Sequence, residues 1–116
     1  MTIYNAYFII KPDADYLSNL EQYMIFEWDS KKNEINIKKH GISFEEAKFV
    51  FSDPLHLAIL DKRFNYFEER WITVGKIPTE KIVVVAHIYF DNDGEEVIRI
   101  ISARIATPSE RRQYES

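Results

Sequence analysis

Two arginines near the C-terminus are the residues of this sequence best suited to chemistry. Arg99 lies inside the run from Val97 to Ala103, which is otherwise apolar and β-branched apart from Ser102, and Arg104 follows directly. This composition is typical of a buried strand, where an unpaired charge is costly. A guanidinium binds two oxygens of a phosphate or carboxylate and keeps its charge. We therefore expect Arg99 to meet either a carboxylate or an anionic ligand.

Alternation along the strand decides whether the two arginines act on one surface. Because strand side chains alternate between faces, Arg99 is expected on the face of Val97 and Ala103, and Arg104 on the opposite face with Ile98. Only a β-bulge between them would bring both arginines to one side.

A short helix is predicted directly after this strand. Thr107 is its expected N-cap, Pro108 occupies the first helical position, and Glu110 follows three residues after the cap. Arg111 and Arg112 would lie on this helix. There they could form a solvated face, stabilise the helix end, or bind an acidic segment of a partner protein.

The composition indicates one soluble domain with a modest core. The chain has 116 residues, 46% hydrophobic content, and only three glycines and four prolines, which argues against disorder. It has no cysteine, so neither a disulfide framework nor a thiolate zinc site is available. No signal segment or membrane-spanning run is found. We expect a cytoplasmic protein without membrane contact.

Charge is segregated along the chain. The net charge of -4 does not fit a protein that grips nucleic acid through an overall basic excess, so any such contact must be local. The stretch from Arg99 to Arg112 holds four arginines and one acid, whereas Asp91 to Glu96 holds four acids and no base.

The other elements predict an α+β fold around this strand. Residues 1–23 are expected to form an N-terminal extension, either disordered or with an extra strand and short helix, before a domain at 24–116. Segregated helices and a strand meander predict an antiparallel sheet with two N-terminal helices packed on one face and a short C-terminal helix. The uncovered face is the expected working surface. The predicted strands are 24–28, 55–60, 71–74, 82–89 and 97–103, and the predicted helices are 31–40 and 44–51.

Local signals set the boundaries of these elements. Asp29 or Ser30 is expected to cap the first helix, Gly41 to end it, and Ser43 to open the second helix through a capping box. Gly75 is expected to close the strand that starts at Trp71.

Several blocks of the sequence resemble the BrnT toxin family. They are FEWD at 26–29, KHGISFEEA at 39–47, FSDP at 51–54, EER at 68–70, IRIISAR at 98–104, ER at 110–111 and YE at 114–115. Blocks in this order through about residues 24 to 115 are far more specific than a lone motif. The resemblance implies a RelE-like endoribonuclease toxin of a type II module that cleaves RNA and inhibits translation. It also implies a BrnA-like antitoxin, through which alone the toxin would reach operator DNA.

Metal-independent RNA cleavage requires a base for the 2′-hydroxyl, a cation at the phosphoryl group and an acid for the leaving 5′-oxygen. Arg99 and Arg70 are the candidates for the cation. Histidine side chains suit proton transfer near neutral pH, so His40 is one candidate for this role, and Glu69 is the other if burial raises its pKa. No cofactor or metal is expected, because no histidine pair has metal-ligand spacing. The candidates for RNA contact are Lys39, Ser102, Arg104 and Tyr66.

Each catalytic candidate also has a structural interpretation. His40 could instead stabilise the C-terminal end of the first helix. His87 lies in an apolar strand and is expected to be a core or cross-strand residue. Glu68 to Arg70 could form edge-strand charges that pair with Arg99 across the sheet.

A second function stays open beside the nuclease. The chain could be a catalytically silent corepressor that only binds the antitoxin. The acidic net charge supports this alternative. Phe90 and Ile105 support it too, because they are apolar at positions where the resemblance leads us to expect cations.

Overall fold

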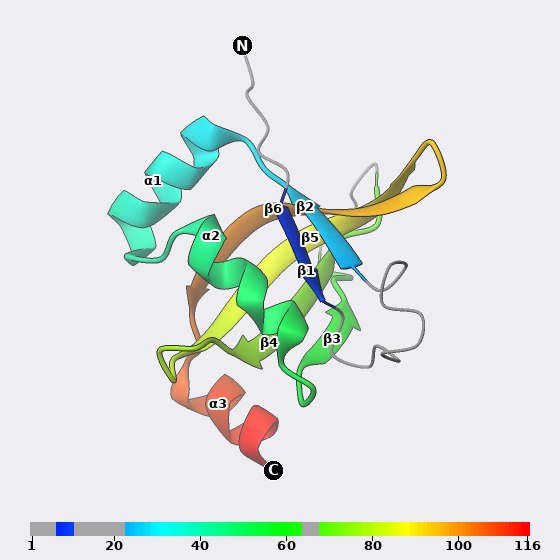
Figure 1. Ribbon diagram of the computed structural model, residues 1–116. Helices are drawn as coiled ribbons and strands as arrows, with labels where there is room; N and C mark the ends of the chain where they lie inside the picture. The colour runs from blue at the N-terminus through cyan, green and yellow to red at the C-terminus, as the bar shows by residue number, and fades with distance from the viewer. Residues whose placement is uncertain (1–6, 11–22, 64–67) are drawn as a thin grey trace.

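The described residues fold around a mixed sheet of six strands. The computed structural model describes residues 7–10, 23–63 and 68–116, and its sheet has the order β1-β2-β6-β5-β4-β3 (Figure 1). The strands are β1 (Tyr7–Ile10), β2 (Tyr23–Glu27), β3 (Leu57–Leu60), β4 (Trp71–Lys76), β5 (Ile82–Asn92) and β6 (Glu95–Ile105). The helices are α1 (Ser30–His40), α2 (Phe44–Ala47) and α3 (Pro108–Glu115), and the 3-10 turn η2 (Lys48–Ser52) continues α2. The α+β class is confirmed.

The prediction of a purely antiparallel sheet is wrong at one pair of strands. β2 runs parallel to β6, with Ile25 opposite Val97 and Glu27 opposite Arg99, whereas the other neighbouring strands are antiparallel. β2 and β6 are far apart in the chain, so no hairpin turn fixes their relative direction. Local sequence signals could not reveal this pairing.

The long hairpin of β5 and β6 contains the β-bulge on which the placement of the arginines depends. Ala86 lies opposite Ser102, but His87 lies opposite Ile100, so Ile101 is the extra residue of β6. The core cluster accordingly takes Ile98, Ile100 and Ala103 from β6. The expected alternation is therefore wrong beyond Ile101, and Ala103 faces the core instead of sharing a face with Arg99.

The core lies between the sheet and the segment formed by α2 and η2. Figure 1 shows α2 in front of the sheet, and its buried residues pack against β5 and β6. Phe26 and Phe51 meet with ring centroids 5.3 Å apart, and Trp28 meets Phe44 edge-on at 6.1 Å. Aromatic packing therefore binds the helical layer to β2.

Gly75 does not end β4 as predicted but lies within it. A Cβ at this position would stand 2.9 Å from the carbonyl oxygen of Val50 in η2. The glycine thus permits close contact between η2 and the strand. Close approach of another backbone segment, and not the end of the strand, explains why glycine occupies this position. β4 then continues to Lys76.

Beyond the end of β2, helix α1 provides the hydrogen-bond partner for the edge of β6. Asp29 caps the helix, Gly41 ends it in a left-handed conformation, and Ser43 and Glu46 form the predicted capping box of α2. The buried side chain of Asn36 accepts from the Ala103 amide at 3.1 Å and donates to the Ala103 carbonyl at 2.8 Å. Its amide therefore occupies the backbone groups that β6 would otherwise leave unpaired beyond β2.

The C-terminal helix begins as predicted. The Thr107 hydroxyl accepts from the Glu110 amide, the Glu110 carboxylate accepts from the Thr107 amide, and Pro108 is at the helix start. No residue of α3 is buried, so polar contacts hold it.

The short helix expected within the extension of residues 1–23 lies outside the described residues, and Tyr23 already belongs to β2. Among the described helices, none has the length and apolar character needed to cross a membrane.

Candidate functional site

The strongest candidate site is an arginine and carboxylate pair on the sheet face opposite the core. Arg99 donates from Nε and Nη2 to the same oxygen of Glu27, at 2.9 and 2.7 Å. β2 and β6 place the two residues directly opposite each other. The side chains remain accessible, with 36% of Arg99 and 18% of Glu27 exposed. Thus the strand charge is compensated, yet solvent still reaches it.

An aromatic ring borders this pair. The guanidinium carbon of Arg99 lies 5.2 Å from the ring centroid of half-buried Phe90 on β5. Phe90 therefore contributes a cation–π contact that orients the arginine. The same ring is an aromatic surface beside Arg99 on which a nucleic-acid base could stack.

Arg70 directly precedes β4, and the β4–β5 register extended by one residue assigns it to the face of Arg99. Trp71 pairs with His87, so the register continued by one residue places Arg70 level with Ile88, and Ile88 is paired with Arg99. Two strand spacings separate the arginines, about 10 Å. Arg70 forms an ion pair of 3.8 Å with Glu68, so the proposed pairing of the 68–70 charges with Arg99 is not what the structure shows.

The bulge brings Arg104 to this face as well. Arg104 binds Glu110 of α3 through two hydrogen bonds of 2.7 and 2.8 Å. These bonds lower the pKa of Glu110 to about 2 and raise that of Arg104. Ser102, another expected RNA contact, is exposed at the bulge between the two arginines. Arg104 therefore has a structural role that the sequence did not reveal.

The two proton-transfer candidates do not meet Arg99. Asn36 binds Ala103, about 13 Å along β6 from Arg99, and His40 lies one helical turn beyond Asn36. His40 ends α1 and is half-buried. Glu69 is exposed and makes no hydrogen bond or ion pair with the described part of the chain.

The other two expected RNA contacts are separate from the pair. Lys39 is exposed on α1, and Tyr66 lies outside the described residues. Of the predicted site residues, the structure therefore groups Arg70, Arg99, Ser102 and Arg104 on one face.

His87 is a core histidine, as expected. It is fully buried, and its Nε2 lies 2.7 Å from the Thr73 hydroxyl on β4. Phe51 packs against its ring edge-on, with centroids 4.7 Å apart. Burial, and to a lesser degree the charge of His56, lowers its pKa to about 3, so the ring is neutral at physiological pH.

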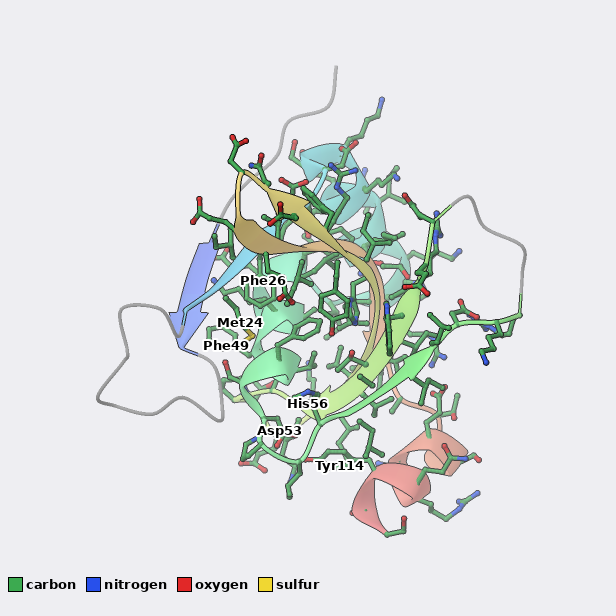
Figure 2. All side chains as sticks on the ribbon, turned by 90° about the vertical axis from the view of Figure 1, so that its right-hand side faces the viewer. Met24, Phe26, Phe49, Asp53, His56 and Tyr114 are labelled. Carbon is green, nitrogen blue, oxygen red and sulfur yellow. The ribbon has the colours of Figure 1, made fainter. Side chains whose placement is uncertain are left out.

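A second polar cluster fixes α3 to the body of the protein. Figure 2 shows Tyr114 beside Asp53 and His56, and the Tyr114 hydroxyl donates to Asp53 at 2.5 Å. The Lys76 and Leu55 amides donate to the same carboxylate. Burial alone would raise the pKa of Asp53, but these hydrogen bonds keep it lowered, while burial and Asp53 raise that of Tyr114 to about 12.

Sequence reasoning missed Glu27 as a functional candidate. The available signal was a carboxylate in the middle of the apolar run from Met24 to Trp28. A charge there needs a partner, as Arg99 does, but the parallel pairing that joins them is invisible in the sequence. In the described part of the chain, no three histidine or carboxylate side chains are grouped so as to hold a metal ion.

The sheet, its capping helices and its paired arginine define a small α+β protein with an accessible ion pair on the sheet face opposite the core. A family model described as "Ribonuclease toxin, BrnT, of type II toxin-antitoxin system" matches residues 28–110. The chain therefore belongs to the BrnT family, and the resemblance noted in the sequence is confirmed.

A solved structure also matches. It is the crystal structure of the Brucella abortus ribonuclease toxin BrnT, with 27% sequence identity and a TM-score of 0.46. The match covers 69% of this chain and 92% of that one. A comparison with curated proteins found no match.

Proposed function

We propose that this chain is a metal-independent endoribonuclease that cleaves RNA and so inhibits translation, with a RelE-like site on the open face of its sheet. Family membership supports the ribonuclease class. The observation that carries the site is the accessible contact of Arg99 with Glu27, which sets a fixed cation and a potential proton acceptor side by side.

The pair provides two of the three groups that the reaction requires. The carboxylate of Glu27 takes the proton from the 2′-hydroxyl, whose oxygen then attacks the phosphorus and displaces the 5′-oxygen. Arg99 stabilises the negative charge that develops on the phosphoryl oxygens. Protonation removes the charge of Glu27, so the charge of Arg99 becomes fully available as the phosphoryl charge grows.

Neighbouring groups bind the rest of the substrate. Arg70, about 10 Å across the sheet, suits an adjacent phosphate, and Phe90 suits a base. His40 and Glu69 remain candidates for the acid, and each requires movement or substrate contact to reach the scissile bond. Lys39, like these, would act from outside the face that holds Arg99.

The first experiment asks whether the chain has this activity. Induced expression should arrest growth, and purified protein should cut an RNA oligonucleotide in the presence of EDTA. Cleavage that requires a divalent ion would contradict the metal-independent mechanism. Intact RNA together with unimpaired growth would contradict the nuclease.

A second experiment tests the role of Glu27. Glu27→Gln keeps a side chain that can contact Arg99 but removes the proton acceptor. Its cleavage rate should fall about 10²-fold or more. Glu34→Gln, on the exposed side of α1, is the matched control and should cleave normally. Equal activity of Glu27→Gln and wild type would exclude Glu27 as the base.

The corepressor alternative also has a structural observation in its favour. Arg70, Arg99 and Arg104 each already have a carboxylate partner. A chain that binds a BrnA-like antitoxin and operator DNA as a complex, but leaves RNA intact, would establish this function instead. We place either function in the domain at 24–116, with residues 1–23 as an extension, in the cytoplasm.

A further inference from the structure

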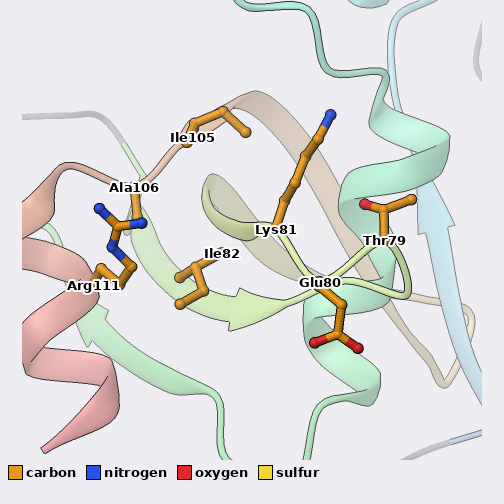
Figure 3. Close-up of a pocket in the computed structure, with 7 residues that line it drawn as sticks. All are labelled: Thr79, Glu80, Lys81, Ile82, Ile105, Ala106 and Arg111. Carbon is orange, nitrogen blue, oxygen red and sulfur yellow. The ribbon is translucent and has the colours of Figure 1, made fainter.

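A pocket of about 310 Å³ lies away from the Arg99 site, between the β4–β5 turn, the end of β6 and α3. Figure 3 shows Arg111 of α3 on one side and Lys81 and Thr79 of the turn on the other. Apolar side chains lie between these polar rims. The lining residues are Thr79, Glu80, Lys81, Ile82, Ile105, Ala106 and Arg111.

Backbone hydrogen bonds hold the walls of this pocket in place. The Ile77 amide donates to the Lys81 carbonyl at 3.0 Å, and the Glu80 amide donates to the Ile77 carbonyl at 2.9 Å. The Ala106 amide donates to the Ile82 carbonyl at 2.9 Å, which fixes the end of β6 against the start of β5. The pocket is thus formed before any ligand arrives, which lowers the entropic cost of binding.

Its two cations have no carboxylate partner in the part of the chain that the structure describes. Within the described residues, neither Lys81 nor Arg111 makes an ion pair, whereas the nearest acids are engaged elsewhere. Glu80 lies 3.6 Å from Lys76, and Glu110 is bound by Arg104 at 2.7 Å. The rims are therefore available to an external anion.

The floor between the cations is apolar. Ile105 is 44% exposed there, and Ile82 closes the base of the pocket. An isoleucine this exposed on a protein rich in charge would gain from burial against an apolar group of a ligand. The complementary ligand thus combines an apolar side chain with carboxylates at a short distance on either side.

We propose that this pocket binds an acidic peptide segment with an apolar anchor residue, supplied by the antitoxin that family membership implies. The anchor packs on Ile82 and Ile105, and flanking carboxylates pair with Lys81 and Arg111. RNA fits less well, because no aromatic side chain lines the pocket to stack a base. The proposal rests on the toxin-antitoxin assignment, but not on RNA cleavage by this chain.

The test uses the full chain and two blocked synthetic peptides. One repeats Leu-Glu-Glu-Leu, and the other replaces each Glu by Lys. Backbone amide NMR shifts should show that the acidic peptide, but not the basic one, perturbs residues 79–82, 105–106 and 111. The affinity should fall steeply between 50 and 300 mM salt, on the order expected for screened ion pairs. Perturbation centred elsewhere would overturn the proposal.

Variants then separate this pocket from other cationic surfaces. Lys81→Gln combined with Arg111→Gln should raise the dissociation constant of the acidic peptide at least about tenfold. Lys32→Gln combined with Lys38→Gln removes the same charge from exposed positions of α1 and should leave binding unchanged. Equal weakening in both double variants would show a nonspecific charge effect. Ile105→Glu, which leaves both cations in place, should also abolish binding.

An RNA oligonucleotide provides the remaining comparison. If uridine decamer perturbed the same pocket amides with higher affinity than the acidic peptide, the pocket would be part of an RNA surface and the proposal would be wrong. Peptide binding by a chain that cleaves no RNA would sustain this inference while the nuclease failed. Normal cleavage by the Lys81 and Arg111 double variant is the result expected if the two sites are separate.

Discussion

At the scale of single residues, His87 shows how burial fixes the charge of a side chain. The folded pKa of about 3 lies below the ordinary value of 6.5, so the neutral form is favoured in the folded state. The stability from this residue is fully present above pH 6.5 and declines as the pH falls towards 3.

Wild-type protein should therefore lose about 2 kcal/mol of unfolding free energy between pH 7 and pH 5 through His87 alone. His87→Gln cannot titrate and should show a correspondingly smaller loss. Urea denaturation at the two pH values measures the difference. Parallel losses in the two proteins would mean that His87 is not held neutral by the core.

Glu110 is a residue whose charge the fold requires. It accepts from Nη1 and Nη2 of Arg104 and caps α3, and its pKa of about 2 lies below the ordinary value of 4.5. Its contribution to stability is therefore complete above about pH 4.5 and is lost as the pH falls towards 2.

Glu110→Gln should cost about 1–2 kcal/mol at pH 7, a figure reduced for the partial exposure of the pair. The variant should also lack the part of the acid-induced loss that Glu110 causes in wild type. Glu45→Gln, exposed on α2, is the control and should change stability little. A variant as stable as wild type at pH 7 would show that the Arg104 contact contributes nothing.

Predictions from the sequence succeeded for residues with local partners. The caps at Asp29, Ser43 and Thr107 depend on atoms within a few residues, and all three are present. Glu27 and Arg99, by contrast, are separated by 72 positions. Sequence alone showed that Arg99 needed an anion, but not which one.

At the scale of elements, the contact of α1 with β6 depends on one side chain. Asn36 makes hydrogen bonds to Ala103 and also donates to the Ile42 carbonyl at 2.9 Å. In the sequence, Asn36 is one polar residue among many on a highly charged helix. Its burial became evident only once the free edge of β6 was placed beside the helix.

Asn36→Ala should reduce the unfolding free energy by about 2–4 kcal/mol, because buried backbone groups of β6 lose their partner. Lys38→Ala, exposed on the same helix, should cost less than about 0.5 kcal/mol. Chemical denaturation compares the two variants with wild type. A loss for Asn36→Ala no larger than for Lys38→Ala would refute the edge-capping role.

The bulge at Ile101 limits what could be predicted about the site. Strict alternation separates Arg99 from Arg104, and nothing in IRIISAR marks the residue that leaves the ladder. A bulge arises from the register of two strands, so it is a property of the pair and not of one segment. The sequence did identify the strand itself, at 97–103, and the strand that precedes it, at 82–89.

At the scale of the whole molecule, two electrostatic features limit how this protein could bind RNA: its acidic net charge and the pairing of the arginines on its open sheet face. A net charge of -4 repels a polyanion, while three arginines of the open face each stand beside a carboxylate. Binding by such a protein has to be local and dependent on a few contacts. The overall architecture was predictable as α+β, but the direction of β2 was not, because no short turn fixes it.

The single measurement that tests the central claim is the rate constant for cleavage of one RNA oligonucleotide in EDTA, compared between wild type and Arg99→Lys. Lysine keeps the charge but lacks the planar fork that contacts both Glu27 and a phosphate. The rate should fall about 10²–10³-fold without loss of the fold, judged by circular dichroism. Lys32→Ala, on the exposed side of α1, should cleave at the wild-type rate. Undiminished cleavage by folded Arg99→Lys would contradict a site built on Arg99 and Glu27.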